Sequence, residues 1–482
     1  MDGVEPRGPM WNRRNFLASL GVLATPTVLT SPAHAEPTGG KGRTLVLGCV
    51  LHFLDDPGDA AENGPWELFE RGALVVEDGH VAWVGDRDAL PPRHRGGVVV
   101  DYGDRLVVPG FVDCHVHYSQ VDVIASYGRQ LLDWLQTYVF PVESQFGDAN
   151  HARKIAGFFL DRLLACGTTT ASVFPTVHTE SVDAFCAEAR RRELRMLCGK
   201  VLMDREPFAP PFLRDPDVDT ARAQTLELVD RWHGVGRLGY SLTPRFAPSS
   251  TEAMLRMVGE LRAQRPDLWL QTHLAENTAE VKLVHELFGG RSYLDVYDRH
   301  GLLGPRSLYA HCIYIDDQDR ARLAETGSAI AFCPTSNLFL GSGLFDLHHA
   351  RAAGVAVGLG TDIGAGTSYS ILQTLNEAYK ALALQGQPLS GHRGFYLATL
   401  GGAQALDLTD RIGNFSPGKE ADFVVLDWNA TPELARRTRV AKTFTERLFA
   451  LMTLGDDRAV HATHVLGRRH HSTHTIPIPA GR

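Results

Sequence analysis

A regular alternation of short apolar runs and longer amphipathic runs, from residue 109 onward, constrains the fold of this chain more than any other feature. We predict strands at the apolar runs, which cover residues 110–116, 168–174, 195–203, 238–244, 268–273, 307–312, 329–333 and 355–361. Amphipathic helices are predicted between them, including residues 152–165, 181–193 and 252–263, with Thr251 capping the last. Eight strand–helix repeats over about 250 residues are typical of an α/β fold, the closed (β/α)8 barrel of the TIM type, whose active site lies at the carboxyl ends of the strands.

Short β-like runs flank the predicted barrel on both sides. They cover residues 44–48, 72–76, 80–84 and 98–100 before it, and residues 421–426 and 460–466 after it. Asp78-Gly79 predicts a hairpin turn between the second and third runs. We therefore predict a small β-sandwich domain built from residues 36–108 and 401–482, with the barrel at residues 109–400. The polar end that carries His470, His471 and His474 is interpreted as a solvated tail rather than a metal site.

The composition limits the classes of function. The 482-residue chain is 44% hydrophobic and 22% charged, which is typical of a globular protein and excludes a disordered or collagen-like chain. Its formal net charge of -8 argues against a protein built mainly to bind nucleic acid, because phosphate binding requires clustered cations. The seven cysteines are odd in number and scattered, so we predict buried thiols rather than a disulfide framework.

Residues 1–35 are predicted to be a leader rather than part of the fold. Arg13 and Arg14 lie in a twin-arginine pattern, which is followed by an apolar stretch over residues 17–29 and by Ala-His-Ala, a small-residue cleavage site, at residues 33–35. The apolar stretch is too short to span a bilayer, so we expect an exported protein whose mature form does not enter the membrane. The alternative is a disordered extension on a cytoplasmic protein.

Histidines and an aspartate at the predicted strand ends indicate a metal site. His115 and His117 are two residues apart on the first strand, so their side chains point to the same face. His273 and His311 lie at the ends of the fifth and sixth strands, and Asp362 follows the eighth. The alternative is that these residues are merely buried in the core. It would have to apply to every one of them at once, although all of them lie at the same rim of the barrel. Three imidazoles and a carboxylate suit Zn²⁺, with Fe²⁺ as second choice, and we predict His115, His117, His273 and Asp362 as the ligands.

Glu276 lies three residues after His273, just beyond the strand end, where a carboxyl group can carry protons. Its alternative role is that of an ordinary glutamate at the start of a helix. Zinc lowers the pKa of a bound water towards about 7, so this set of residues predicts hydrolysis at neutral pH. A different class of zinc site, which needs a Pro-Cys-x-x-Cys motif, is excluded because this sequence lacks that motif.

These residues resemble a known family. The His-x-His motif after Pro-Gly-Phe at residues 109–111, the later histidines and aspartate, and the divided β domain are similar to the amidohydrolase superfamily. Binuclear members carry a modified lysine at the end of the fourth strand, whereas residues 243–246 here are Thr-Pro-Arg-Phe. Lys200 falls within the third strand and is predicted to be structural. The resemblance therefore implies one metal ion per subunit, as in the deaminase branch.

Motifs outside the shared metal site resemble the guanine deaminase family within that branch. They lie at residues 117–120, 124–128, 131–135, 243–248, 272–276 and 333–337. The resemblance implies that Gln120 and Arg245 hydrogen-bond the polar edge of guanine, that Phe246 stacks against its ring, and that His273 and Glu276 also contact it. Buried donors left without partners cost several kcal/mol, so such a pocket would reject purines that lack those acceptors.

Simpler roles stay open for the substrate residues. Arg245 would otherwise form a salt bridge at the barrel rim, and Phe246 would pack there. Trp134 is left undecided between the core and a lid over the site.

The reaction implied by the resemblance is hydrolytic deamination of guanine to xanthine and ammonia, a step of purine catabolism. Asp362 would help to deprotonate the water, and Glu276 would carry protons to the ring nitrogen and then to the leaving amine. His311 would stabilise the oxygen that develops on the attacked carbon. The resemblance also implies a homodimer.

Two rival hypotheses remain. One is a related hydrolase that deaminates or dechlorinates another heterocycle, such as a triazine, a pterin or an oxidised guanine. The other is a non-catalytic barrel without metal, against which the complete set of predicted ligands argues.

Overall fold

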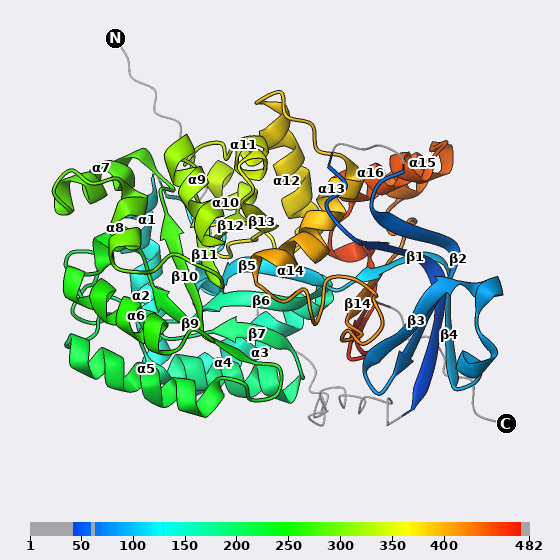
Figure 1. The fold of residues 1–482 in the computed structure, drawn as a ribbon, viewed down its shortest axis with the longest axis horizontal. Coiled ribbons are helices and arrows are strands. Elements are labelled where there is room, and N and C mark those ends of the chain that lie inside the picture. The colour runs from blue at the N-terminus through cyan, green and yellow to red at the C-terminus, as the bar shows by residue number, and fades with distance from the viewer. Residues whose placement is uncertain (1–41, 59–62, 129, 474–482) are drawn as a thin grey trace, which may run out of the picture. The chain divides into compact units, whose positions relative to one another are not determined.

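The computed structural model describes residues 42–58, 63–128 and 130–473. The predicted leader at residues 1–35 and His474 lie outside the described residues. The predicted barrel is confirmed: its parallel strands follow one another in the order β13-β12-β11-β10-β9-β7-β6-β5 (Figure 1). Their bounds are β5 (Phe111–His117), β6 (Thr168–Phe174), β7 (Arg195–Cys198), β9 (Gly239–Pro244), β10 (Trp269–Leu274), β11 (Ser307–His311), β12 (Ala329–Phe332) and β13 (Ala356–Leu359).

The third predicted strand, at residues 195–203, is the one that the structure corrects. It is divided into β7 and the two-residue β8 (Val201–Leu202), each of which pairs with β9. Gly199 lies at the break, where a Cβ atom would be 1.8 Å from the carbonyl oxygen of Ser241. The two backbones approach each other so closely there that regular pleated pairing is interrupted.

Backbone hydrogen bonds between β5 and the residues after β13 close the barrel. The amide of Asp362 donates to the carbonyl of His115 at 2.9 Å, and the amide of His117 donates to the carbonyl of Ile363 at 2.8 Å. These bonds connect two predicted ligands, His115 and His117, to a third, Asp362, and to its neighbour Ile363. The closure therefore also fixes the relative positions of the metal-site residues.

Helices cover the outside of the barrel (Figure 1). They are α3 (Ala149–Ala165), α4 (Thr179–Arg191), α5 (Val218–Trp232), α6 (Glu252–Gln264), α7 (Thr278–Leu287), α8 (Tyr293–Arg299), α9 (Asp317–Thr326), α10 (Pro334–Phe339), α11 (Leu347–Ala352) and α12 (Ile371–Ala383). The predicted cap of α6 is confirmed, because the hydroxyl of Thr251 accepts from the amide of Met254 at 3.2 Å.

A helical segment that the sequence analysis did not predict connects β5 to α3. It comprises the 3-10 turn η3 (Tyr118–Val123), α1 (Leu131–Trp134), the π-helix η4 (Leu135–Val139), α2 (Phe140–Glu143) and the 3-10 turn η5 (Ser144–Gly147). Because β5 ends at the rim with His117, this segment starts directly at the site and contributes side chains to it.

The flanking segments form one seven-stranded sheet, as predicted for a domain built from both. Its strand order is β16-β15-β14-β4-β1-β2-β3. The strands are β1 (Arg43–Phe53), β2 (Trp66–Glu77), β3 (His80–Asp86), β4 (Val98–Pro109), β14 (Phe423–Leu426), β15 (Val460–Val465) and β16 (Arg468–Ser472). Antiparallel pairing of β4 with β14 joins the two parts of the chain. The predicted hairpin is confirmed, with Asp78 and Gly79 at positive φ (49° and 83°).

Strand β16 corrects the interpretation of residues 468–471 as a solvated tail. It pairs antiparallel with β15 through a turn in which Leu466 and Gly467 both have positive φ (49° and 74°). The sequence Arg-Arg-His-His-Ser lacks the alternation of apolar and polar residues that predicts a strand, so pairing with β15 decides its structure.

The carboxyl-terminal half also supplies helices between the barrel and the small sheet. These are α13 (Gly391–Tyr396), the π-helix η7 (Leu397–Gly401), α14 (Gly402–Ala405), α15 (Pro432–Val440) and α16 (Phe444–Leu454). At the amino ends of β7 and β9, Glu420 accepts from Arg195 at 2.8 Å and from Arg237 at 2.9 Å. All seven cysteines are buried free thiols, as predicted. Over the described ranges, no helix has both the length and the apolar character needed to cross a membrane.

Candidate active site

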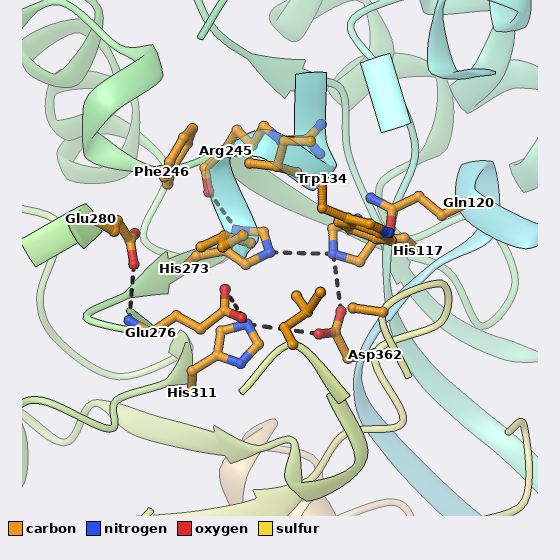
Figure 2. Close-up of a pocket in the computed structure, with 14 residues that line it drawn as sticks. His117, Gln120, Trp134, Arg245, Phe246, His273, Glu276, Glu280, His311 and Asp362 are labelled. Atoms are coloured by element: carbon orange, nitrogen blue, oxygen red, sulfur yellow. Dashed lines mark hydrogen bonds and ion pairs between the residues drawn. The ribbon is translucent and has the colours of Figure 1, made fainter. Parts of the chain in front are cut away.

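Ring nitrogens and carboxylate oxygens of the predicted ligands converge at the carboxyl end of the barrel. Nε2 of His117 lies 3.2 Å from Nε2 of His115 and 3.2 Å from Nε2 of His273. Oδ1 of Asp362 lies 3.3 Å from Nε2 of His115 and 3.4 Å from Nε2 of His117. Figure 2 shows Glu276, His311 and Asp362 facing His117 and His273. The structure thus brings all the predicted metal-site residues together.

Alternation along β5 and unusual backbone angles at the other strand ends aim these side chains inward. His115 and His117 lie on the same face of β5, as their spacing predicts. His311 and Asp362 both have positive φ (72° and 52°), a conformation that L-residues rarely adopt. Such strained positions concentrate at functional sites, where the surrounding structure holds them.

Partners behind the cluster orient its imidazoles. Nδ1 of His273 donates to the carbonyl oxygen of Arg245 at 2.7 Å, so its Nε2 carries the free lone pair. Nδ1 of His311 donates to Oδ1 of Asn337 at 2.9 Å. Both rings are therefore fixed in rotation and in tautomer.

Asp113, beneath the cluster, connects the first and last strands of the barrel. Its carboxylate accepts from the amide of His115 at 3.2 Å, and from the amide and hydroxyl of Thr361 at 3.0 and 2.5 Å. Burial raises the pKa of Asp113 to about 7, although the hydrogen bonds from Thr361 oppose that rise. We interpret Asp113 as a support for the ligand strands, because its oxygens are already used by backbone and hydroxyl donors.

Burial sets the protonation of the cluster. It lowers the pKa of His115, against the attraction of Asp362, and it lowers the pKa values of His117 and His273 well below the ordinary range, with neighbouring imidazoles adding to the effect. Burial alone would raise the pKa of Asp362, but the attraction of His115 and the other imidazoles brings it down to about 2. Neutral imidazoles beside an ionised carboxylate are the forms that bind a metal ion.

The cluster fits a single metal ion. Two sets of potential ligand atoms lie within one ion's reach, His115 with His117 and His273, and His115 with His311 and Asp362. Four atoms held about 2.0–2.1 Å from one ion at the corners of a tetrahedron lie roughly 3.3–3.4 Å apart, close to the spacing observed. The lone pair on Nε2 of His273 points into this cluster beside the carboxylate of Asp362, and such a set of buried acceptors suits a cation. His115, His117, His273 and Asp362 are the residues that would hold it.

A pocket of about 410 Å³, including its mouth, opens onto the cluster. The predicted substrate residues Gln120, Arg245 and Phe246 line it together with Glu276. Trp134 also lines it, and its indole N–H donates to the hydroxyl of Ser126 at 2.9 Å, so the structure places this residue in the wall of the pocket.

Arg245 lines the pocket, where a substrate contact is open to it, and it also forms the salt bridge that was its alternative role. Its guanidinium is paired with Glu143, with 2.5 Å between its nitrogen and Oε2. Phe246 packs against Phe208 with ring centroids 5.9 Å apart and also lines the pocket.

Glu276 lies between the cluster and the pocket. Oε1 accepts from the hydroxyl of Ser342 at 3.0 Å, and Oε2 lies 3.5 Å from Nε2 of His311. Its amide donates to Glu280 at 3.0 Å, so Glu276 is held at the start of the loop before α7 (Figure 2). Burial raises the pKa of Glu276 to about 7, against the attraction of His311. A carboxyl group with this pKa can both donate and accept a proton at neutral pH.

Several residues of the site had no assigned role in the sequence analysis: Glu143, Glu280, Asn337 and Ser342. Asn337 lies within the motif at residues 333–337, which resembles the family but did not indicate what Asn337 does. Glu143 had no signal, because it follows an unpredicted π-helix. Lys200 is buried against Asp215 and is absent from the pocket lining, in agreement with the structural role predicted for it.

Comparison with known proteins shows which family the sequence matches. The sequence profile of the amidohydrolase family matches residues 106–469, and that of a bacterial imidazolonepropionase-like composite domain matches residues 72–96. Guanine deaminase of Escherichia coli is 48% identical over 424 residues, which cover 87% of this chain and 95% of that protein.

Solved structures give the same result. Guanine deaminase from Bradyrhizobium japonicum superposes with a TM-score of 0.86 at 35% identity, over 90% of this chain and 100% of that one. Guanine deaminase from C. acetobutylicum, solved with guanine bound in its active site, gives a TM-score of 0.78 at 28% identity, over 89% of this chain and 99% of that one.

Proposed function

Because this chain belongs to the guanine deaminase family of the amidohydrolases, we propose that it hydrolyses guanine to xanthine and ammonia. One observation carries the proposal: a single pocket joins the cluster of His117, His273 and Asp362 to the donors Gln120 and Arg245. The cluster supplies the chemistry of hydrolysis, and the donors complement the O6 and N7 acceptors on one edge of guanine.

The metal of this site is proposed to be one Zn²⁺ per subunit, with Fe²⁺ as the alternative. Three imidazoles and one carboxylate are a zinc ligand set, and no lysine follows the fourth strand to bridge a second ion. Zinc bound there would lower the pKa of a coordinated water towards about 7.

The side chains around the cluster divide the proton transfers among them. The carboxylate of Asp362 accepts a proton from the attacking water, since its low pKa keeps it ionised. Glu276 donates its proton to the ring nitrogen beside the attacked carbon, and then takes up the second proton of the water as the oxygen on that carbon becomes a carbonyl. It passes this proton to the amine, which departs as ammonia when the C–N bond breaks, and the first proton returns from Asp362 to Glu276. His311, which Asn337 holds in place, stabilises the oxygen that forms on that carbon. Guanine and one water thereby give xanthine and one ammonia.

Ammonia release tests the proposal directly. Purified, zinc-loaded protein is assayed with guanine, adenine and melamine, with and without a chelator. We expect chelator-sensitive release from guanine and none from the other two. Zinc binding without guanine turnover, or turnover of the triazine melamine instead, would overturn the substrate assignment while leaving the hydrolytic site intact. Protein that folds but binds no metal would support a non-catalytic barrel.

We propose that the protein is a homodimer, which rests on the resemblance to the family. Light scattering at micromolar concentration measures the mass directly. A mass of one chain would contradict this proposal.

We propose export by the twin-arginine route, which rests on Arg13 and Arg14 and the small-residue site before residue 36. Fractionation of cells that carry the native chain is compared with the Arg13→Lys/Arg14→Lys variant. Export of the native chain alone supports the proposal, and retention of both in the cytoplasm contradicts it.

A further inference from the structure

The carboxylate of Glu143 is shared between the two side chains that face the substrate edge. Oε1 accepts from Nε2 of Gln120 at 2.9 Å, and Oε2 accepts from the guanidinium of Arg245 at 2.5 Å. Only 1% of Glu143 is exposed, and it lies 23 residues from Gln120 and 102 from Arg245 in the chain. We propose that Glu143 is a positioning residue that aims Gln120 and Arg245 at the substrate and thereby sets the preference for a 6-oxopurine. This inference rests on the proposed function.

The π-helix explains how Glu143 reaches this place. The amide of Phe140 donates to the carbonyl of Leu135, a bond that spans five residues instead of four and so adds one residue to the turn. In an uninterrupted α-helix that buries Leu131 and Leu135 towards the pocket, the next positions on that face are 138–139 and 142. The added residue shifts these positions to 139–140 and 143, where Val139, Phe140 and Glu143 are all buried. Such π-turns are frequent at functional sites.

Glu143 determines which way the amide of Gln120 points. An ionised carboxylate only accepts hydrogen bonds, so the NH₂ group of Gln120 must face it. Oε1 of Gln120 then accepts from the amide of Gly364 at 3.2 Å. Both ends of the amide are therefore assigned, and the second N–H of Nε2 is the group that remains for a ligand.

The same carboxylate fixes Arg245. One guanidinium nitrogen is bound to Glu143, and the plane lies over the ring of Phe140 at 5.2 Å. The remaining N–H groups are donors, like the remaining N–H of Gln120. This edge of the pocket therefore presents donors alone, and it favours acceptors such as O6 and N7. A 6-amino group is itself a donor and could not accept hydrogen bonds from this edge. Glu143 also balances the charge of Arg245, so the edge suits a neutral ring.

A positioning role and a merely structural role predict different results for the Glu143→Gln variant. The replacement has the same shape, but one of its two acceptor oxygens becomes a donor, so it cannot accept from both partners. If Glu143 positions the donors, we expect the KM for guanine to rise about tenfold or more, with kcat within roughly threefold of the original protein. The preference for guanine over 2-aminopurine, which lacks O6, should fall by a similar factor. A structural role would lower the melting temperature and leave that preference unchanged.

Glu420→Gln provides the matched control, because Glu420 also shares one carboxylate between two side chains, here two arginines at the amino ends of β7 and β9. We expect it to lower the melting temperature without changing KM or the preference. Glu143→Asp, which keeps an acceptor-only carboxylate, is expected to recover part of the preference. In an Arg245→Met background, Glu143→Gln should cost much less than it does alone, because the two residues act together.

Zinc-loaded full-length protein is used throughout, and the outcomes are distinct. If the original protein releases no ammonia from guanine, the proposed function fails. If it does, but both Glu143 variants keep the original KM and the original preference over 2-aminopurine, the inference is overturned. Loss of folding in Glu143→Gln leaves Glu143→Asp to decide between the two roles.

Discussion

Nδ1 of His273 donates to the backbone carbonyl of Arg245 at 2.7 Å, which places a predicted metal ligand one hydrogen bond away from a predicted substrate residue. The carbonyl of Arg245 orients the imidazole, whereas its guanidinium extends to Glu143. In the proposed mechanism, substrate recognition and metal binding therefore share Arg245 but use different atoms of it. A change of side chain at position 245 should separate the two functions.

Replacing Arg245 by Met should leave metal binding unchanged and weaken the binding of substrate. The carbonyl that holds His273 is retained, so zinc content should stay near one ion per chain, while the KM for guanine rises about 10- to 100-fold through the lost charge-assisted bond. His273→Ala should instead lose zinc. Metal analysis and steady-state kinetics of both variants check this, and loss of zinc in Arg245→Met would contradict it.

We also expect Arg245→Met to lower the free energy of unfolding. The substitution leaves the carboxylate of Glu143 buried without its cation, at a cost of about 3–5 kcal/mol. Adding Glu143→Gln removes the stranded charge, so the double variant should be more stable than Arg245→Met alone. Denaturant unfolding measures both free energies.

Glu276→Gln should lower kcat by about 10²- to 10⁴-fold, because the amide cannot transfer a proton. Burial raises the pKa of Glu276 to about 7, and the donor step needs the protonated form. In the original protein kcat/KM should therefore fall as the pH rises through about 7, and this limb should be absent from the residual activity of the variant. A pH–rate profile that is flat from pH 6 to 8.5 would argue against Glu276 as the donor.

Asn337→Ala should reduce kcat with little change in KM. Without Oδ1 the Nδ1 proton of His311 loses its acceptor, so the ring is free to rotate or to change tautomer; losses of about 10- to 100-fold are typical when such a partner is removed. Asn337→Asp, which keeps the acceptor, should retain more activity than the alanine variant. Equal losses of kcat in Asn337→Ala and Asn337→Asp would show that the acceptor oxygen at position 337 does not support catalysis.

His464, in the small sheet, should make the protein sensitive to acid. Its ring lies between the hydroxyl of Tyr102 at 2.7 Å and the carbonyl of Gly467 at 3.1 Å, and burial lowers its pKa to about 3. The unfolded chain protonates near pH 6.5 while the folded chain does not, so stability is lost as the pH falls from 6.5 towards 3, by about 2 kcal/mol at pH 5. Unfolding free energies at pH 5 and pH 7.5 should differ less in His464→Gln than in the original protein.

The strands and the convergence of the predicted metal-site residues are the parts that the sequence predicts well. Hydrophobic periodicity is local, so β6, β9 and β10 appear in the sequence close to where they lie in the structure. His115, His117, His273, His311 and Asp362 could be predicted to meet because carboxyl ends of parallel strands share one rim. Family motifs added Gln120, Arg245 and Phe246.

The interruption at Gly199, the strand β16 and the position of Glu143 could not be predicted in this way. Gly199 breaks a strand because a partner backbone comes close, and residues 468–472 form a strand because β15 offers its edge. Glu143 meets Arg245 across 102 residues only because one extra residue in a helical turn rotates it inward. The sequence by itself therefore determined the barrel and the meeting of the histidines and the aspartate at its rim, through local periodicity and spacing. The tertiary structure decided how the substrate donors are held, because that depends on contacts between segments whose meeting no local pattern records.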